Sequence, residues 1–110
     1  MNEKSEVHQT IDEMVRRIVR QFRPEKIILF GSHARGAGGP DSDVDLLVVL
    51  PVQGSKRKKA VEIYKLLAGI GVPKDVIVVT PEDIEKYKDL AGNIIGPALS
   101  EGKILYERAS

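Results

Sequence analysis

The spacing of apolar residues along the chain predicts a mixture of helices and strands. Between residues 5 and 22, apolar side chains recur every three or four positions, as they do on the buried face of an amphipathic helix. Residues 26–30 and 44–50 form two continuous apolar runs, which have the length of strands that are covered on both faces. The later segments predict, in order, a helix over residues 55–68, a strand over 75–79, a helix from residue 80, a short helix over 93–100 and an edge strand over 104–106.

Proline, glycine and capping residues mark the boundaries of these elements. Pro24 ends the first helix, because the residue before a proline is disfavoured in helical conformations. A stretch of glycines closed by Pro40 interrupts regular structure between the first two strands. Residues 80–83, Thr-Pro-Glu-Asp, supply the hydroxyl, the proline and the acid of a helix start. We therefore expect an α/β (α+β) fold, with a small mixed β-sheet and helices mainly on one face.

Length and composition narrow the class of protein. The 110 residues are predicted to form one domain, 1–110, which is long enough for a single hydrophobic core. We expect no membrane association, because no apolar run approaches the roughly 18 residues of a membrane-spanning helix. The absence of cysteine excludes disulfides and thiolate metal sites and favours a cytoplasmic location. A net charge of +1 gives no strong nucleic-acid signal.

Four aspartates are candidates for a metal site. Asp41, Asp43 and Asp45 lie within five residues, and Asp75 begins the predicted third strand. Residues two apart on a strand share a face, so Asp43 and Asp45 are expected to point the same way. Two carboxylates about 4 Å apart repel by about 4 kcal/mol at an effective dielectric constant of about 20, so either the acids splay into solvent or a cation lies among them. Acids carried on a strand cannot splay freely, which favours the cation. Carboxylate oxygens that leave positions for water and phosphate suit Mg²⁺.

The Gly31-Ser32 turn after the first strand is a candidate phosphate-binding site. Glycine has no side chain to block a close approach, and we expect the turn to open into a short helix whose first amides are unpaired. Ser32 adds a hydroxyl group, and Arg35 adds a guanidinium group one turn further on. In-line phosphoryl transfer requires such an amide-lined cradle facing a metal-binding pair of acids. These residues therefore indicate phosphoryl chemistry.

The same residues resemble a known family. Gly31-Ser32, ten further residues and then Asp43-Val44-Asp45 are similar to the signature of the DNA polymerase β nucleotidyltransferase superfamily. The longer segments GSHARG and DSDVDLLVV resemble its minimal nucleotidyltransferase branch, and the similarity extends over nearly the whole chain. The resemblance implies the polymerase β-like nucleotidyltransferase fold.

The resemblance also implies a role for each of these residues. Asp43 and Asp45 would bind two Mg²⁺ ions, and Asp75 would bind one of the ions and act as the general base or lie beside it. Gly31 and Ser32 would hold the terminal phosphates of ATP. The acceptor attacks the α-phosphate, AMP is transferred and pyrophosphate leaves. Small members of this family serve as antitoxins, which add AMP to a tyrosine of a HEPN-family ribonuclease toxin.

The length of the chain favours a partner protein as the acceptor. A chain of 110 residues builds the nucleotide-binding half of such a site and leaves no second domain for an acceptor. We therefore expect a protein adenylyltransferase antitoxin that pairs with a HEPN toxin and uses ATP and Mg²⁺. Two alternatives stay open: a non-catalytic antitoxin that inhibits the toxin by binding, and a transferase that acts on a small molecule or an RNA end. The sequence sets neither base preference nor oligomeric state, and a homo-oligomer is compatible with it.

Other residues near these motifs have competing interpretations. Arg35 is equally a phosphate ligand or an ion-pair partner of the acidic strand, and His33 is expected to face solvent. A calcium-binding loop that begins at Asp41 is excluded, since Leu46 and Val52 stand where that loop requires glycine and glutamate. Asp41 is therefore expected to be a loop acid and not a metal ligand.

The helix predicted over residues 55–68 begins with a basic run. Lys56, Arg57, Lys58 and Lys59 lie in its first turn, where the helix dipole disfavours cations. We interpret this run as a solvated surface, with binding of RNA or an acidic partner as the alternative. The buried stripe of this helix is predicted to comprise Val61, Tyr64, Leu67 and Ala68.

Overall fold

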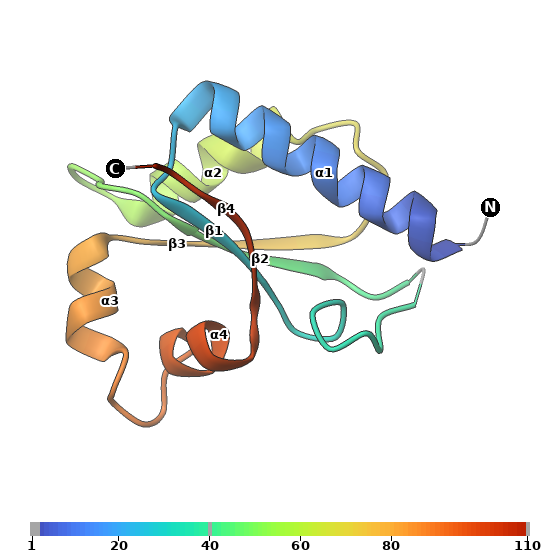
Figure 1. The fold of residues 1–110 in the computed structure, drawn as a ribbon. Coiled ribbons are helices and arrows are strands. Elements are labelled where there is room, and N and C mark those ends of the chain that lie inside the picture. Colours follow the sequence, from blue (N-terminus) through green and yellow to red (C-terminus); the bar gives the residue numbers. More distant parts are fainter. Residues whose placement is uncertain (1–2, 40, 110) are drawn as a thin grey trace.

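The computed structural model describes residues 3–39 and 41–109, and this part of the chain contains four helices and four strands (Figure 1). In chain order the elements are α1 (Glu3–Phe22), β1 (Lys26–Phe30), β2 (Val44–Val49), α2 (Lys56–Leu66), β3 (Lys74–Val79), α3 (Pro81–Tyr87), α4 (Ile95–Glu101) and β4 (Lys103–Glu107). Every helix and strand predicted from the apolar pattern is present. Pro40, which closes the predicted glycine-rich break, lies outside the described residues.

The four strands form one mixed sheet in the order β3-β2-β1-β4. β1 pairs antiparallel with β2 and with β4, whereas β2 pairs in parallel with β3. The two central strands correspond to the two continuous apolar runs, and residues 27–29 and 46–49 are buried. The mixed sheet and the edge position of β4 therefore confirm the sequence-based prediction.

Helices cover both faces of the sheet (Figure 1). The two longer helices, α1 and α2, pack on one face against side chains that include Ile27, Leu46 and Val76. The short helices α3 and α4 pack on the opposite face, where Ile28 and Leu47 are buried. The prediction of helices mainly on one face therefore describes the two longer helices, and the short helices α3 and α4 add a partial layer on the other face.

The buried side of α2 differs from the predicted stripe. Ile63 and Leu67 are fully buried, but Val61 and Tyr64 are 46% and 37% exposed, and Ala68 is exposed as well. α2 lies over the edge strand β3, so only a narrow side of this helix meets the core. The predicted stripe is therefore wrong for three of its four residues.

No helix in the described part of the chain combines the length and the apolar character needed to cross a bilayer.

The start of α3 is held by the predicted capping residues and by a lysine from α2. The Asp83 amide donates to Thr80 Oγ1 and the Thr80 amide donates to Asp83 Oδ2, each at 3.0 Å. Lys56 Nζ donates to the same Oδ2 at 2.8 Å. The hydrogen bond from Lys56, followed by that from the Thr80 amide, holds the pKa of Asp83 below its ordinary value. Lys56, the first residue of the basic run, therefore joins α2 to α3.

We expect Asp83→Asn to lower the free energy of unfolding by about 1 kcal/mol at neutral pH, because it removes the charged bond to Lys56 and weakens the helix cap. Folding lowers the pKa of Asp83, so its carboxylate stabilises the fold above the ordinary aspartate pKa of about 4. That stabilisation is lost as the pH falls below this value. Urea unfolding of the two proteins between neutral pH and about pH 3 should therefore show a difference that shrinks on acidification.

Glu85→Gln is the matched control for this prediction. It removes an exposed pair with Lys88 on the same helix and should cost only about 0.3 kcal/mol. A deficit for Asp83→Asn that stays constant with pH would contradict the assignment of the stabilisation to the ionised carboxylate.

Candidate active site

The end of β1 and the start of β2 bring the Gly-Ser turn against an aspartate. Phe30 lies opposite Asp45 in the antiparallel pair, so Gly31 follows directly beside the Asp45 carboxylate. Gly31 has a φ of +76°, and a Cβ at this position would collide with Asp45 Oδ2. Only glycine therefore allows both the backbone conformation of the turn and its close approach to the acid.

Residues 31–37 form one tight turn instead of the predicted short helix. The amides of residues 35–37 donate back to carbonyl oxygens of residues 31–33 at 2.9–3.3 Å. Gly36 then adopts a φ of +75°, which takes the chain out of the helical path. Among the described residues, no oxygen accepts a hydrogen bond from the amides of residues 32–34. The helix prediction is wrong, but three adjacent amides still provide donors for an anion.

His33 joins this turn to the loop that precedes β2. Its Nε2 lies 3.1 Å from the carbonyl oxygen of Ser42, and a carbonyl can only accept, so Nε2 carries the proton. Ser42 also accepts a hydrogen bond from the Gly39 amide through its Oγ, at 3.1 Å. His33 is half-buried, so the expectation that it faces solvent is wrong. The hydrogen bond from His33 thus fixes the distance between the Gly-Ser turn and Ser42, the residue before Asp43.

Three of the four candidate aspartates meet at this end of the sheet. Asp75 pairs with Asp45 across the parallel strands, and Asp43 directly precedes β2. Burial raises the pKa of Asp45, and the charges of Asp75 and Asp43 raise it further, against smaller opposing effects of His33 and Arg35. In the described part of the chain, neither Asp43 nor Asp45 forms an ion pair. The site therefore concentrates negative charge that His33 and Arg35 offset only in part.

The chemistry of these donors fits a divalent cation. Carboxylate oxygens are the ligands that Mg²⁺ prefers, and the raised pKa of Asp45 means that positive charge is favourable beside it. No three histidine or acidic side chains in residues 3–39 and 41–109 already enclose a metal-sized position. Asp43 and Asp45 thus supply suitable oxygen donors at this end of the sheet, while Asp75 Oδ1 accepts a hydrogen bond from a tyrosine.

That tyrosine, Tyr64 of α2, is a residue of the site that the sequence did not reveal. Its Oη donates to Asp75 Oδ1 at 3.0 Å and accepts a hydrogen bond from the Val76 amide at 2.7 Å. Burial raises the pKa of Tyr64, the Val76 amide opposes this effect, and the Asp75 and Asp43 carboxylates raise the pKa further, so the hydroxyl keeps its proton at neutral pH. Tyr64 has the spacing of a core residue, and only the position of α2 over β3 brings it to Asp75.

Arg35, which follows the Gly-Ser turn in the chain, is one of the residues that line a pocket. The pocket has a volume of about 270 Å³ and lies between the turn and α4, with Phe30, Gly31, Ile94 and Pro97 among its lining residues. Arg35 is exposed and forms no ion pair within the described residues, so the interpretation as a partner of the acidic strand is not observed. Its guanidinium group is therefore available to an anion.

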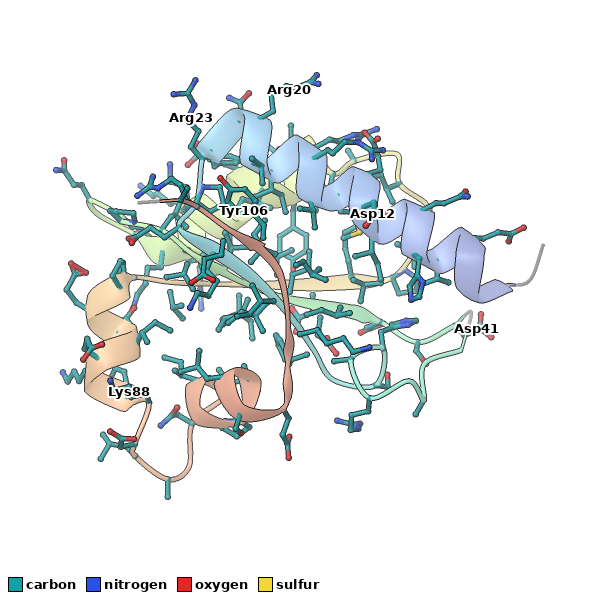
Figure 2. The ribbon with its side chains drawn as sticks, in the orientation of Figure 1. Asp12, Arg20, Arg23, Asp41, Lys88 and Tyr106 are labelled. Carbon is teal, nitrogen blue, oxygen red and sulfur yellow. The ribbon has the colours of Figure 1, made fainter. Side chains whose placement is uncertain are left out.

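Two other sequence candidates lie apart from this site. Figure 2 shows Asp41 at the outer end of the loop before β2, where it is exposed. In the basic run, Lys56 binds Asp83, and Lys59 Nζ lies 5.4 Å from the centroid of the Phe22 ring. Two of the four cations in the run thus have structural partners.

We expect Asp45→Asn to raise the free energy of unfolding at neutral pH by about 0.5–2 kcal/mol, because it removes a partly buried charge beside two like charges. Folding raises the pKa of Asp45, so the wild-type fold loses stability as the pH rises through and above the ordinary aspartate value. The gain should therefore vanish near about pH 3, where the carboxyl is neutral. Urea unfolding measures both values, with the exposed Asp41→Asn as a control expected to change little. A destabilised Asp45→Asn protein at neutral pH would show that the carboxylate serves the fold.

The chain matches a known protein family over most of its length. Residues 11–103 match the profile of the family described as "Nucleotidyltransferase domain". The predicted protein adenylyltransferase MJ1305 of Methanocaldococcus jannaschii is 34% identical over 115 residues, which cover 98% of this chain and 76% of that protein. A second predicted protein adenylyltransferase from the same organism, MJ0604, is 34% identical over 109 residues. This match covers 96% of this chain and 100% of MJ0604.

Solved structures share the fold. A predicted nucleotidyltransferase from Sulfolobus solfataricus has a TM-score of 0.68 at 18% identity, covering 96% of this chain and 84% of that one. A mutant of the toxin-antitoxin MntA-HpeT and a toxin-antitoxin with AMP-PNP have TM-scores of 0.62 and 0.61 at 15% and 19% identity. Each of these two matches covers 88% of this chain and 73% of the matched chain. The expected nucleotidyltransferase fold is confirmed, and the chain belongs to the nucleotidyltransferase domain family.

Proposed function

We propose that this chain transfers AMP from ATP to a tyrosine hydroxyl of a HEPN-family toxin and so acts as an antitoxin. The observation that carries the proposal is the strand register, which sets Asp45 beside the Gly31-Ser32 turn and Asp75 on the other side of Asp45. The amides of residues 32–34 in that turn have no acceptor among the described residues. The names of the two relatives support a protein as the substrate. The toxin-antitoxin structures support a toxin as the partner, and AMP-PNP in one of them supports ATP as the donor.

In this proposal the aspartates and the Gly31-Ser32 turn have different tasks in the reaction. Asp43 and Asp45 would hold two Mg²⁺ ions, whose positive charge would be supplied to the phosphates and to the departing pyrophosphate. The amides of the Gly31-Ser32 turn and the Ser32 hydroxyl hold the terminal phosphates. Asp75 accepts the proton of the attacking hydroxyl. A bond forms between the tyrosine oxygen and the α-phosphorus as the bond from that phosphorus to the bridging oxygen of pyrophosphate breaks.

The pocket between the Gly-Ser turn and α4 receives the nucleoside part of ATP in this proposal. Gly31 belongs to both the pocket and the phosphate cradle, so one ligand can occupy the two together. Its lining includes the apolar side chains of Phe30, Ile94 and Pro97, which suit the faces of a flat base and a sugar. Arg35 in the same lining contacts a phosphate.

The acceptor is proposed to arrive at the opposite side of the site. Asp75 is exposed near the start of β3, on the face of the sheet that also carries Asp45, so a hydroxyl group can reach it from solvent above that face. A cytoplasmic location, where ATP and such a toxin would both be present, is part of the proposal and is expected from the cysteine-free sequence.

We expect Asp43→Asn to reduce AMP transfer by about 10²-fold or more, because it removes a negatively charged ligand of the Mg²⁺ ions that would stabilise charge on the phosphates. The assay mixes the chain with Mg²⁺, ATP labelled at the α-phosphate and a purified candidate toxin of the HEPN family. Label on the toxin measures transfer, and growth of cells that express both proteins measures neutralisation. Asp41→Asn is the matched control, since that residue is exposed at the outer end of the same loop (Figure 2), and the variant should transfer AMP normally.

Two outcomes of this assay would contradict the proposal. Full neutralisation by Asp43→Asn without label on the toxin would indicate an antitoxin that acts by binding alone. Label that appears on RNA or on a small molecule, and not on the protein, would indicate a transferase with another acceptor.

We expect Ile94→Ala to weaken binding of AMP-PNP about fivefold and to leave the affinity for inorganic tripolyphosphate unchanged, because it shortens one wall of the pocket without touching the phosphate cradle. Calorimetric titration with both compounds in the presence of Mg²⁺ measures the two affinities. Ile104→Ala is the control, since that isoleucine is 56% exposed on β4 and is not part of the pocket. An equal decrease in affinity for the two compounds would indicate that the pocket binds the phosphates and not the nucleoside.

A further inference from the structure

Tyr64 makes two hydrogen bonds that tie its hydroxyl to the strand carrying the proposed base. The Val76 amide donates to Tyr64 Oη at 2.7 Å, and Oη lies 3.0 Å from Asp75 Oδ1. Because Oη already accepts from the amide, its own proton is directed to the carboxylate. The hydroxyl is therefore oriented by the residue that immediately follows Asp75.

These bonds restrict a side chain that has little else to hold it. Asp75 is exposed, lies on the edge strand and has β2 as its neighbour on one side. Among the described residues, Tyr64 is the donor to its carboxylate. Without that bond, the side chain would be free to move among its staggered rotamers. With the bond, Oδ1 is occupied and Oδ2 remains available.

We propose that Tyr64 is a positioning residue that holds the Asp75 carboxylate in one orientation for the transfer reaction, with Oδ2 left free to receive the acceptor's proton. The inference rests on the proposed function, because it assumes that Asp75 acts in the reaction. Tyr64 comes from α2, on the face of the sheet opposite to that on which Asp45 and Asp75 lie, and it reaches Asp75 around the edge of β3. It can therefore fix the carboxylate without occupying the space above the acids where ATP and the acceptor meet.

A purely structural role is the alternative for the same two bonds. In that case Tyr64 would only fasten α2 to β3, and its removal would loosen the fold and the nucleotide site together. A positioning role acts on turnover through Asp75 and leaves nucleotide binding intact. The two roles therefore separate in the affinity for AMP-PNP and in the dependence of the effect on Asp75.

The test is a double-mutant cycle with Tyr64→Phe, Asp75→Asn and the combined variant. Tyr64→Phe keeps the ring and removes the hydroxyl. It should lower the turnover of AMP transfer to the toxin at saturating ATP and Mg²⁺ by about 10-fold, within the range typical of residues that support a reacting group. The affinity for AMP-PNP should not change. Asp75→Asn alone should lower turnover by about 10²–10⁴-fold, and adding Tyr64→Phe to it should cost nothing more.

Tyr106→Phe is the matched control. Tyr106 lies on β4 opposite Ile27 and packs against the core formed under α1 and α2, whereas Asp45 lies opposite Phe30 at the other end of β1. Its variant should keep wild-type turnover.

Three results would overturn the inference. One is wild-type turnover in Tyr64→Phe. Another is an equal factor of decrease in turnover when Tyr64→Phe is introduced into the wild-type protein and into Asp75→Asn. The third is a parallel loss of AMP-PNP affinity, which would assign Tyr64 to the fold. Wild-type turnover in Asp75→Asn would remove the base from the proposed function as well, whereas a slow Asp75→Asn beside an unaffected Tyr64→Phe would remove this inference alone.

Discussion

Hydrogen bonding between β2 and its two neighbours places Phe30, Asp45 and Asp75 in one row across the end of the sheet. The antiparallel pair sets the Gly31-Ser32 turn against Asp45, and the parallel pair sets Asp75 on its other side. A slip of one residue in either pair would turn Asp45 or Asp75 toward α1 and α2 and into the core. The hydrophobic faces of the central strands oppose such a slip, because every buried residue would also change sides.

This arrangement makes the aspartate side chains repel one another electrostatically. The three carboxylates lie near one another, and burial already disfavours the charge on Asp45. A domain of this size retains only about 5–15 kcal/mol of net stability, so a cluster of like charges is a substantial fraction of it. Ligands that bring positive charge to the acids should bind the folded state selectively and stabilise it by mass action. Stability and ligand affinity are thus set by the same side chains.

Much of this structure could be predicted from the sequence, because local patterns decide it. The central strands appear as continuous apolar runs, and the start of α3 appears in Thr80 and Asp83. Alternation along β2 fixes the face of Asp45, whereas Asp43 lies just before that strand. The features that were not predicted depend on contacts between distant segments. The role of Tyr64 requires α2 to lie over β3, and the bond from His33 to Ser42 requires the glycine-rich loop to fold back. The expected helix after Ser32 failed because Gly36 turns the chain at a positive φ.

The bond between the Val76 amide and Tyr64 has a consequence for association between chains. β3 lies at the margin of the sheet, where outward amides can recruit a strand from another molecule. Tyr64 Oη already occupies the amide of Val76, and the Asp75 side chain beside it carries a charge. An incoming strand would have to displace the tyrosine before it could extend the ladder. The same hydroxyl that orients the acid therefore protects this margin against intermolecular β-pairing.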